Sequence, residues 1–233
     1  MRIGLFGYGT MGKMIERIAS DRGHSIVSRI DTPGEAPAFE TLDIAIDFST
    51  PEAALINVCS CLEHGIPVVS GTTGWMDDFP KAEHLCRQVD GAFLYASNFS
   101  LGMNLFFALN AHLARLMSQF PDYALHITEI HHTRKLDAPS GTAISLAEGI
   151  IENSAYTEWR TEARSPEVIP ITSKRVGDTP GTHRITYDSK VDQIEIQHTA
   201  HNREGFALGA VLAAEWLVDK TGVFGMKDVL NLR

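Results

Sequence analysis

The segment over residues 129–143 reads EIHHTRKLDAPSGTA and gathers several groups that can exchange protons or bind anions. His131 and His132 are adjacent, and Lys135 follows closely. A histidine titrates near neutral pH and can donate a proton, while a lysine can bind an anion or act as an acid. These groups favour proton donation to a negatively charged substrate that lies next to a hydride donor.

The PSGTA sequence behind Lys135 indicates a helix start. Ser140 or a neighbour is expected to cap the helix containing AISLAEGII, because a serine hydroxyl accepts a hydrogen bond from a free amide there. The amides around Gly141 and Thr142 would then face outward and could bind a carboxylate. On a regular strand His131 and His132 point to opposite sides, so at most one of them is expected to face a given ligand.

A second candidate site lies near the N-terminus, where GYGTMG places Gly7, Gly9 and Gly12 between an expected strand and an expected helix. Glycines in the GxGxxG spacing let the backbone approach the pyrophosphate of a dinucleotide. Asp31 ends the next expected strand, where a carboxylate can accept hydrogen bonds from the adenosine ribose. The two features together predict a dinucleotide site.

The residues around Asp31 bear on the choice of cofactor. Thr32 follows Asp31 where an arginine could have bound a 2′-phosphate, so NADH is expected to be at least as acceptable as NADPH. Arg29 leaves that preference open. The loops SGTTG (residues 70–74) and ASNFS (residues 96–100) follow further expected strands, and open α/β sheets bind ligands at such carboxyl ends.

Strands and helices alternate through the first hundred residues, which predicts a Rossmann-type, doubly wound parallel sheet of the α/β class. A short segment after Asp31 is too rich in proline and glycine for a full crossover helix. The expected strands cover residues 2–6, 24–30, 43–49, 67–74 and 92–97, and the expected helices cover residues 11–21, 51–65 and 77–89.

The pattern changes after residue 99 to that of a second α+β domain with a mixed or antiparallel sheet. The last long helix is apolar around most of its circumference, so we expect it to be buried against the first domain. The predicted domains are residues 1–99 and 208–233 for dinucleotide binding, and residues 100–207 for substrate binding and oligomerisation. The elements expected after residue 99 are helices over residues 100–120, 143–151 and 205–220 and strands over residues 123–132, 167–177, 181–189 and 191–201.

Composition excludes several other classes. A net charge of −9 without a long basic run disfavours a nucleic-acid surface. Cys59, Cys61 and Cys86 suit free thiols in a reducing cytoplasm, and no apolar signal or spanning segment suggests a membrane partner. The histidines lack HExxH spacing and no cysteine cluster joins them, so no metal site is expected.

The segment EIHHTRKLDAPSGTA closely resembles the signature of bacterial dihydrodipicolinate reductases, also called 4-hydroxy-tetrahydrodipicolinate reductases. The resemblance continues nearly end to end through IDFSTPEA, GTTG, ASNFSLGMN, HNREGFALGA and MKDVLNL. It implies an enzyme of the diaminopimelate route to lysine that reduces a cyclic imine with hydride from NADH or NADPH. It also implies hinged domains and a homotetramer assembled through the strands between residues 168 and 200.

The same resemblance implies roles for individual residues. His131 would protonate the enamine formed by hydride transfer, and Lys135 would be a second acid and a carboxylate partner. His132, Gly141 and Thr142 would contact the dicarboxylate substrate. The residues implied to bind the cofactor are Gly7, Tyr8, Gly9, Thr10, Met11, Gly12, Asp31, Gly71, Thr72, Thr73, Ala96, Ser97, Asn98 and Phe99.

Two other classes of protein share parts of this pattern: another two-domain oxidoreductase, of which two kinds are considered, and a non-catalytic sensor. Another two-domain amino-acid dehydrogenase needs no cysteine and is disfavoured only by the substrate loop. A phosphorylating semialdehyde dehydrogenase needs a thiolate between its domains, whereas all three cysteines fall on expected helices of the first domain. A non-catalytic NAD-binding sensor would leave His131 and Lys135 without a role.

Overall fold

The computed structural model describes residues 1–32, 35, 37–162 and 165–232. The chain divides into two compact units, one formed by Met1–Asn104 with Glu204–Arg233 and the other by Leu105–Arg203. The sequence placed these boundaries after residues 99 and 207. The expected dinucleotide and substrate roles of the two parts remain predictions.

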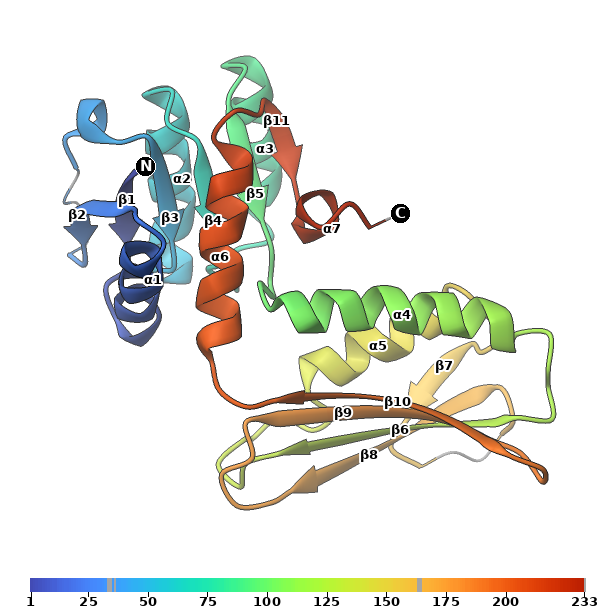
Figure 1. The fold of residues 1–233 in the computed structure, drawn as a ribbon. Coiled ribbons are helices and arrows are strands. Elements are labelled where there is room, and N and C mark those ends of the chain that lie inside the picture. Colours follow the sequence, from blue (N-terminus) through green and yellow to red (C-terminus); the bar gives the residue numbers. More distant parts are fainter. Residues whose placement is uncertain (33–34, 36, 163–164, 233) are drawn as a thin grey trace. The chain divides into compact units, whose positions relative to one another are not determined.

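The first unit contains a six-stranded sheet in the order β11-β5-β4-β3-β1-β2, in which every pair of neighbours is parallel (Figure 1). Parallel strands need crossover connections, and helices supply most of them. The strands are β1 (Arg2–Phe6), β2 (Ser25–Ile30), β3 (Ile44–Asp47), β4 (Val68–Ser70), β5 (Ala92–Tyr95) and β11 (Gly222–Phe224). The helices are α1 (Thr10–Asp21), α2 (Pro51–Glu63), α3 (Phe79–Gln88), α6 (Glu204–Leu217) and α7 (Met226–Val229), with a short 3₁₀ helix η1 (Phe39–Thr41).

Both faces of this sheet are covered, as the near-continuous apolar strands require. α1 and α6 pack with Ile3, Leu5 and Ile46 in one cluster, while α2 and α3 pack with Phe6 and Ala45 in another. The return of α6 to this unit follows from its composition, because its alanine-rich surface is buried against the sheet. The chain therefore closes this unit with its C-terminal segment.

The second unit contains a five-stranded mixed sheet in the order β10-β9-β6-β8-β7. Strand β6 is parallel to β8 and antiparallel to β9, so the expected mixed sheet is confirmed. Its strands are β6 (Ala124–His131), β7 (Glu158–Arg160), β8 (Val168–Arg175), β9 (Gly181–Asp188) and β10 (Gln193–Ala200).

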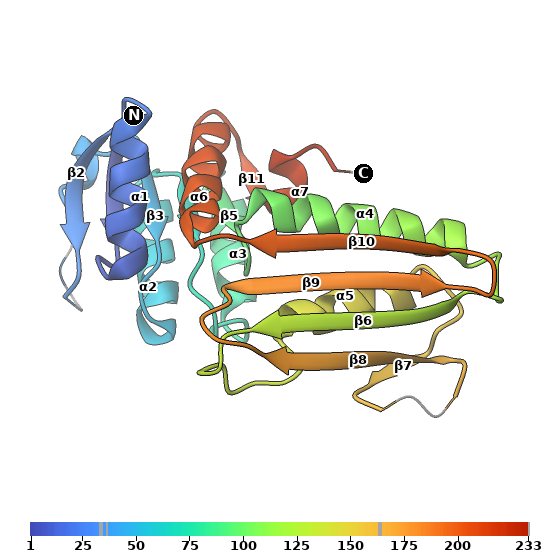
Figure 2. The same cartoon turned by 60° about the horizontal axis from the view of Figure 1, so that its bottom comes forward.

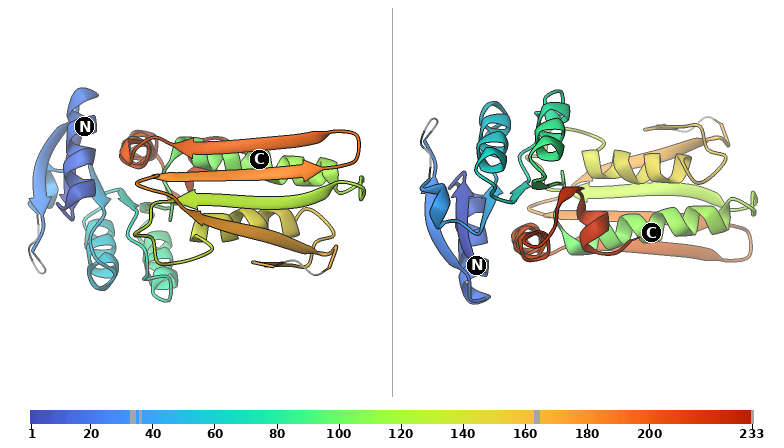
Figure 3. Two further views of the ribbon diagram at one scale, coloured as in Figure 1. Left: turned by 90° about the horizontal axis from the view of Figure 1, so that it is seen from below. Right: turned by 90° about the horizontal axis from the view of Figure 1, so that it is seen from above.

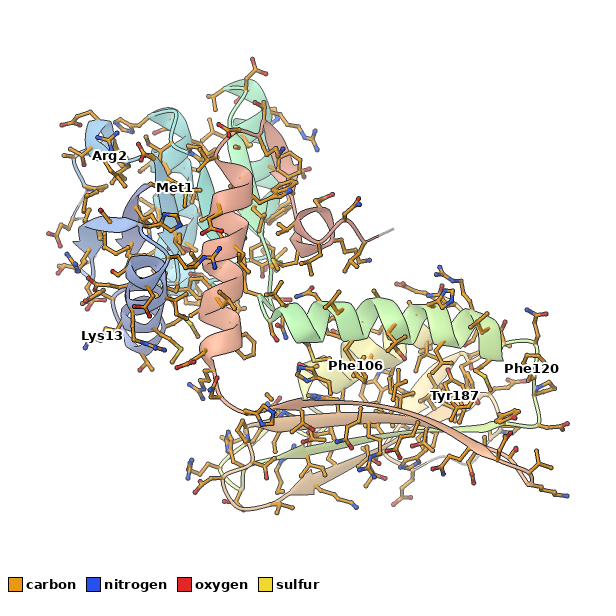
Figure 4. The ribbon with its side chains drawn as sticks, in the orientation of Figure 1. Met1, Arg2, Lys13, Phe106, Phe120 and Tyr187 are labelled. Atoms are coloured by element: carbon orange, nitrogen blue, oxygen red, sulfur yellow. The ribbon has the colours of Figure 1, made fainter. Side chains whose placement is uncertain are left out.

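Helices α4 (Leu101–Met117) and α5 (Gly141–Ile151) lie along one face of this sheet (Figure 2). Phe106 from α4 and Tyr187 from β9 are buried between the helices and the sheet (Figure 4). Within the described residues, the opposite face carries no helix, and Figure 3 shows that bare face in its left view. One face of the sheet is therefore a core and the other is open.

The sequence prediction was wrong in a few particulars. The strand expected over residues 67–74 ends at Ser70, because the chain then turns to bring Thr72 onto the side chain of Asp47. The short strands β7 and β11 and the helix α7 were not anticipated. The expected cysteine positions on α2 and α3 are confirmed, and all three are free thiols.

Candidate active site

A cavity of about 380 Å³ opens beside the carboxyl ends of β1, β2 and β3 in the first unit. This is the edge at which open α/β sheets bind ligands. Its lining residues are Gly7, Gly9, Ile30, Asp31, Thr32, Phe48, Ser49, Thr50, Glu52, Ala53, Ile56 and Asn57. Apolar side chains and two carboxylates, Asp31 and Glu52, therefore face this cavity.

The glycines of GYGTMG have different tasks. Gly7 has φ +89°, and a Cβ there would lie 2.1 Å from the carbonyl oxygen of Phe48. A Cβ on Gly12 would lie 2.3 Å from the carbonyl oxygen of Gly7. Gly12 therefore allows the turn to close on itself, whereas Gly7 allows the loop after β3 to approach the turn. Among the described residues nothing lies within 4 Å of a Cβ built on Gly9, which leaves the space beside the start of α1 open to a ligand. The amides of a helix start can bind an anion there.

Asp31 lines this cavity, and Arg29 lies two residues before it on β2. The Asp31 carboxylate accepts a hydrogen bond of 2.8 Å from the backbone amide of Tyr8. Arg29 is paired with Glu16, and its guanidinium carbon lies 5.6 Å from the centroid of the Tyr8 ring. The hydrogen bond from Arg29 holds the pKa of Glu16 below its ordinary value. The charge of Arg29 is therefore already compensated within the protein.

The loops after β3 and β4 are tied together by Asp47, which is fully buried. Its carboxylate accepts hydrogen bonds from Ser49 (2.6 Å), Asn57 (3.0 Å), Ser70 (2.9 Å) and Thr72 (2.7 Å). Burial raises the pKa of Asp47, and these hydrogen bonds oppose that rise. The buried carboxylate thus holds the loops after β3 and β4 together at the edge of the sheet.

The other residues predicted to bind the cofactor lie in this unit but do not line the cavity. A Cβ on Gly71 would lie 2.3 Å from the Phe48 ring, so this glycine makes room for Phe48. Thr73 is exposed, Phe99 is buried in the core, and the Asn98 side chain accepts a hydrogen bond of 2.9 Å from the Ser100 amide. Within the described chain, the cavity brings together Gly7, Gly9 and Asp31, whereas its lining does not include Tyr8, Thr10, Met11, Gly12, Gly71, Thr72, Thr73, Ala96, Ser97, Asn98 or Phe99.

The second candidate site is built on the helix-facing side of the second sheet. Residues two apart on a strand share a face, so Glu129 and His131 project from β6 on the same side as the buried Leu125 and Ile127. The strand register places His183 of β9 opposite Glu129. It places Arg175 of β8 opposite His131. Strand pairing therefore assembles the group from three separate segments.

Glu129 binds the proton donor predicted from the sequence. Its carboxylate is fully buried and contacts both His131 Nδ1 and a guanidinium nitrogen of Arg175, the latter at 2.9 Å. A carboxylate can only accept, so Nδ1 of His131 carries a hydrogen and Nε2 is directed elsewhere. Burial would raise the pKa of Glu129, but the facing groups Ser173, Arg175 and His131 outweigh it and hold the pKa below its ordinary value.

The His131 ring is 8% exposed, and its pKa is lowered mainly by burial. Glu129 opposes this lowering, while the charges of Lys135 and Arg175 add to it. The His183 ring stands edge-on to the His131 ring with 5.1 Å between centroids. Burial, with His131 nearby, lowers the pKa of His183 to about 4, so His183 is neutral at neutral pH.

His183 connects this group to the start of α5. Its Nε2 lies 3.3 Å from the hydroxyl oxygen of Ser140. Ser140 is the N-cap of α5 and accepts a hydrogen bond of 3.2 Å from the amide of Ala143, which confirms the predicted cap. Gly141 is exposed and Thr142 is half-buried at the same helix start.

Lys135 lies in the loop between β6 and α5 and already has a partner. Its ammonium nitrogen is 2.8 and 2.9 Å from the two carboxylate oxygens of Asp137. Arg175 donates to the carbonyl oxygens of Asp137 (2.6 Å) and Lys135 (3.4 Å), which holds the loop to β8. His132 is half-buried, and its Nδ1 is buried without a hydrogen-bond partner among the described residues.

Ligand atoms of Glu129, His131 and His183 lie within 4.8 Å of one another, a spacing at which three residues could hold a metal ion. Arg175 is ion-paired with the same carboxylate, however, and its positive charge would repel a bound cation. The cluster is therefore described as a hydrogen-bonded and ion-paired group of buried side chains.

The sequence interpretation did not include Glu129, Arg175, His183, Asp47 or Asp137 among the site residues. Only Glu129 had a signal of its own, because it is two residues from His131 on an expected strand. The other four depend on strand register or loop conformation. Among the residues described, we find no helix with both the length and the apolar character needed to cross a membrane.

Comparison with known proteins identifies the family. The models for the N-terminus and the C-terminus of dihydrodipicolinate reductase match residues 1–99 and 102–230. A 4-hydroxy-tetrahydrodipicolinate reductase of Christiangramia forsetii is 55% identical over 235 residues, which cover 99% of this chain and 98% of the relative. The chain belongs to the dihydrodipicolinate reductase family. The resemblance found in the sequence is thereby confirmed.

Other members of the dihydrodipicolinate reductase family extend this result. A 4-hydroxy-tetrahydrodipicolinate reductase of Chromobacterium violaceum is 40% identical over 206 residues, covering 84% of this chain and 76% of that protein. The solved structure of a dipicolinate-bound dihydrodipicolinate reductase from Paenisporosarcina sp. TG-14 covers 98% of both chains with a TM-score of 0.79. At 23% sequence identity this structure establishes the shared fold.

Proposed function

We propose that this protein reduces 4-hydroxy-tetrahydrodipicolinate to tetrahydrodipicolinate in the diaminopimelate route to lysine. Full-length similarity to reductases of that name supports the reaction. The observation in the structure that carries it best is a buried histidine, His131, whose Nδ1 is bound to Glu129. Such a histidine has one ring nitrogen fixed and the other available for proton transfer.

In the proposed reaction, a hydride and a proton are added and water is released. A bound NADH or NADPH would supply the hydride. His131, in its protonated form, would give the proton from Nε2 to the enamine and become neutral. Glu129 would retain its negative charge throughout, because the facing Ser173, Arg175 and His131 keep its pKa low.

The dicarboxylate substrate would be held by the loop between β6 and α5. We assign one substrate carboxylate to Lys135. The ammonium group of Lys135 already binds both carboxylate oxygens of Asp137, which supports its ability to bind a carboxylate. The amides at Gly141 and Thr142, together with His132, would contact the rest of the substrate. A helix start favours negative charge through its free amides and its dipole.

The proposed cofactor site is the cavity of the first unit, with pyrophosphate beside Gly9 and ribose beside Asp31. The Asp31 carboxylate would accept from the ribose hydroxyls and repel a 2′-phosphate. Arg29, the basic side chain that could compensate this repulsion, is bound to Glu16. We therefore propose that NADH is at least as good a cofactor as NADPH.

We also propose a homotetramer in the cytoplasm. The open face of the second sheet supports an assembly through that sheet, and three free cysteines support a reducing compartment. No nucleic-acid or membrane partner is part of the proposal.

The deciding experiment couples this protein to dihydrodipicolinate synthase, which makes the substrate in place from pyruvate and aspartate semialdehyde. Oxidation of NADH and NADPH is followed by absorbance, and omission of the synthase is the control. We expect oxidation only when the synthase is present. If both cofactors bind by calorimetry and neither is oxidised, the reductase is excluded, and an amino-acid dehydrogenase or an NAD-binding sensor must be tested instead.

A further inference from the structure

Arg175 joins two parts of the second unit that the proposed chemistry needs together. Its guanidinium is ion-paired with Glu129 at 2.9 Å and also donates to the carbonyl oxygens of Asp137 and Lys135. One side chain therefore contacts both the carboxylate bound to His131 and the backbone of the loop that carries Lys135. Arginine suits this task because its planar group donates in several fixed directions.

Glu129 has no access to solvent, so its charge must be compensated by the protein. One carboxylate oxygen contacts His131 Nδ1 and the other contacts Arg175. This leaves Nε2 of His131 near Gly181, where a Cβ would come within 3.1 Å of that nitrogen. A residue without a side chain at position 181 thus keeps the Nε2 side of the ring uncrowded.

We propose that Glu129 and Arg175 are positioning residues for proton transfer. Glu129 keeps a hydrogen on Nδ1 of His131, so that Nε2 is the nitrogen that gains and loses the exchangeable proton. Arg175 holds Glu129 and the Lys135 loop in one arrangement. This inference rests on the proposed function of His131 as the proton donor. Neither Glu129 nor Arg175 needs to touch the substrate.

The charges around His131 show what removal of Glu129 would do. The facing groups are Glu129 on β6, Arg175 on β8, the neutral His183 on β9 and Lys135 in the loop. Glu129 is the group among these that favours the protonated ring, since burial and both cations disfavour it. Loss of its charge should lower the pKa of His131 further, so activity should decline at a lower pH on the alkaline side.

The substitution Glu129→Gln also has a predictable effect on hydrogen bonding. A glutamine side chain has one carbonyl oxygen and one amide group where glutamate has two acceptors. If Arg175 keeps the carbonyl oxygen, the amide group faces His131 and donates to Nδ1. The neutral ring must then carry its hydrogen on Nε2, which is the opposite tautomer.

The test is nitrogen NMR of ligand-free protein labelled with ¹⁵N-histidine, with His131→Ala used to assign the His131 signals. We expect the Nδ1–H tautomer in the natural protein, the Nε2–H tautomer in Glu129→Gln, and titration of His131 at lower pH in that variant. In the coupled assay, kcat should fall about tenfold or more with cofactor KM unchanged. The matched control is Glu83→Gln on α3, whose carboxylate pairs with Arg87 at the surface of the first unit and should change neither measurement.

An unchanged tautomer and unchanged titration of His131 in Glu129→Gln would overturn the proposal, whatever the activity. The NMR changes without reductase activity in the natural protein would instead refute the proposed function and leave the positioning intact. If Glu129→Gln does not fold, Arg175→Lys is the second variant. A lysine keeps the positive charge but cannot contact Glu129 and both loop carbonyl oxygens at once. We therefore expect His131 to exchange between tautomers and kcat to fall. One stable tautomer with full kcat would contradict the role of Arg175.

Discussion

Lys135 already binds a carboxylate, because Asp137 of its own loop supplies both oxygens to its ammonium group. The hydrogen bond from Lys135 holds the pKa of Asp137 below its ordinary value, so the partner is negatively charged at neutral pH. A substrate carboxylate at Lys135 would compete with Asp137 for the donors of the ammonium group. The internal ion pair is therefore a competitor of the substrate in the proposed site.

Asp137→Asn should strengthen dicarboxylate binding, because it removes both the competitor and a nearby negative charge. Exposed ion pairs contribute up to about 1 kcal/mol, which corresponds to about fivefold in affinity. Calorimetric titration with dipicolinate measures this change. Asp78→Asn is the control, since Asp78 forms a similar exposed pair with Lys81 in the first unit and should not matter. Equal affinities in the natural protein and Asp137→Asn would argue against a carboxylate site at Lys135.

Asp31→Ala should weaken NADH more than NADPH. The side chain accepts from the Tyr8 amide and lines the cavity, where it would also accept from a ribose hydroxyl. Loss of a hydrogen bond to a charged group costs about 1.5–3 kcal/mol, so we expect about a tenfold or larger loss for NADH. Fluorescence titration of both cofactors measures the ratio, with the exposed Asp21→Ala at the end of α1 as the control. A parallel loss for NADH and NADPH would rule out the ribose contact.

The parts of the site that are local in sequence could be predicted from it, and the others could not. Ser140 was correctly predicted as a cap because capping depends on neighbouring residues in the chain. Contacts of Glu129 with Arg175, and of His131 with His183, depend on which strands pair and in what register. The alternation of each strand determines which face its side chains occupy, but a shift of the pairing by two residues would keep that face and change the partners. The pattern of one strand therefore does not identify the residues opposite it.

At the level of helices and strands, hydrophobic periodicity was sufficient for the long elements. Residues 101–117 and 204–217 are helical as expected, and the eight-residue strands β6, β8, β9 and β10 are present. Strands β7 and β11 have three residues each, too few to show an alternation. Such elements exist because neighbouring strands offer free hydrogen-bonding edges, which is a property of the folded sheet.

Close packing of α6 on the segment after β5 depends on Gly209. A Cβ there would lie 1.7 Å from the carbonyl oxygen of Phe99, which is backbone and cannot rotate away. Gly209→Ala should therefore push α6 from the sheet and destabilise the protein by about 1–3 kcal/mol or more, with weaker cofactor binding if Ala96 to Phe99 contribute to it.

Gly205→Ala in the same helix is the matched control for Gly209→Ala. Its Cβ would make an ordinary contact of 3.6 Å with the Ser100 hydroxyl oxygen, so stability should be equal or slightly higher. Thermal and urea unfolding of the two variants measure the difference. Equal unfolding transitions would show that α6 does not need the close approach seen at Phe99.

At the scale of the whole molecule, the second sheet has one face that no helix of the described residues covers. Strand alternation directs residues such as Thr128, Thr172 and Thr186 to that face, where they are only half-buried. Sheets that are covered on one side can face water on the other, and they can also pair face to face with a second copy. In the proposed homotetramer this face would be covered by a second copy.

Thr128→Arg is the substitution that best tests assembly through this face. Thr128 lies opposite Thr172 on β8 and Arg184 on β9, so an arginine there would be bulky and would add charge beside an existing arginine. If four chains assemble through this sheet, symmetry repeats the defect in every copy, and the tetramer should dissociate to dimers or monomers. Light scattering after size-exclusion chromatography measures the mass.

Val89→Arg, on the C-terminal end of α3 in the other unit, is the control and should leave the mass unchanged. A natural protein with the mass of one chain, or a Thr128→Arg variant that remains tetrameric, would show that this face is not the interface.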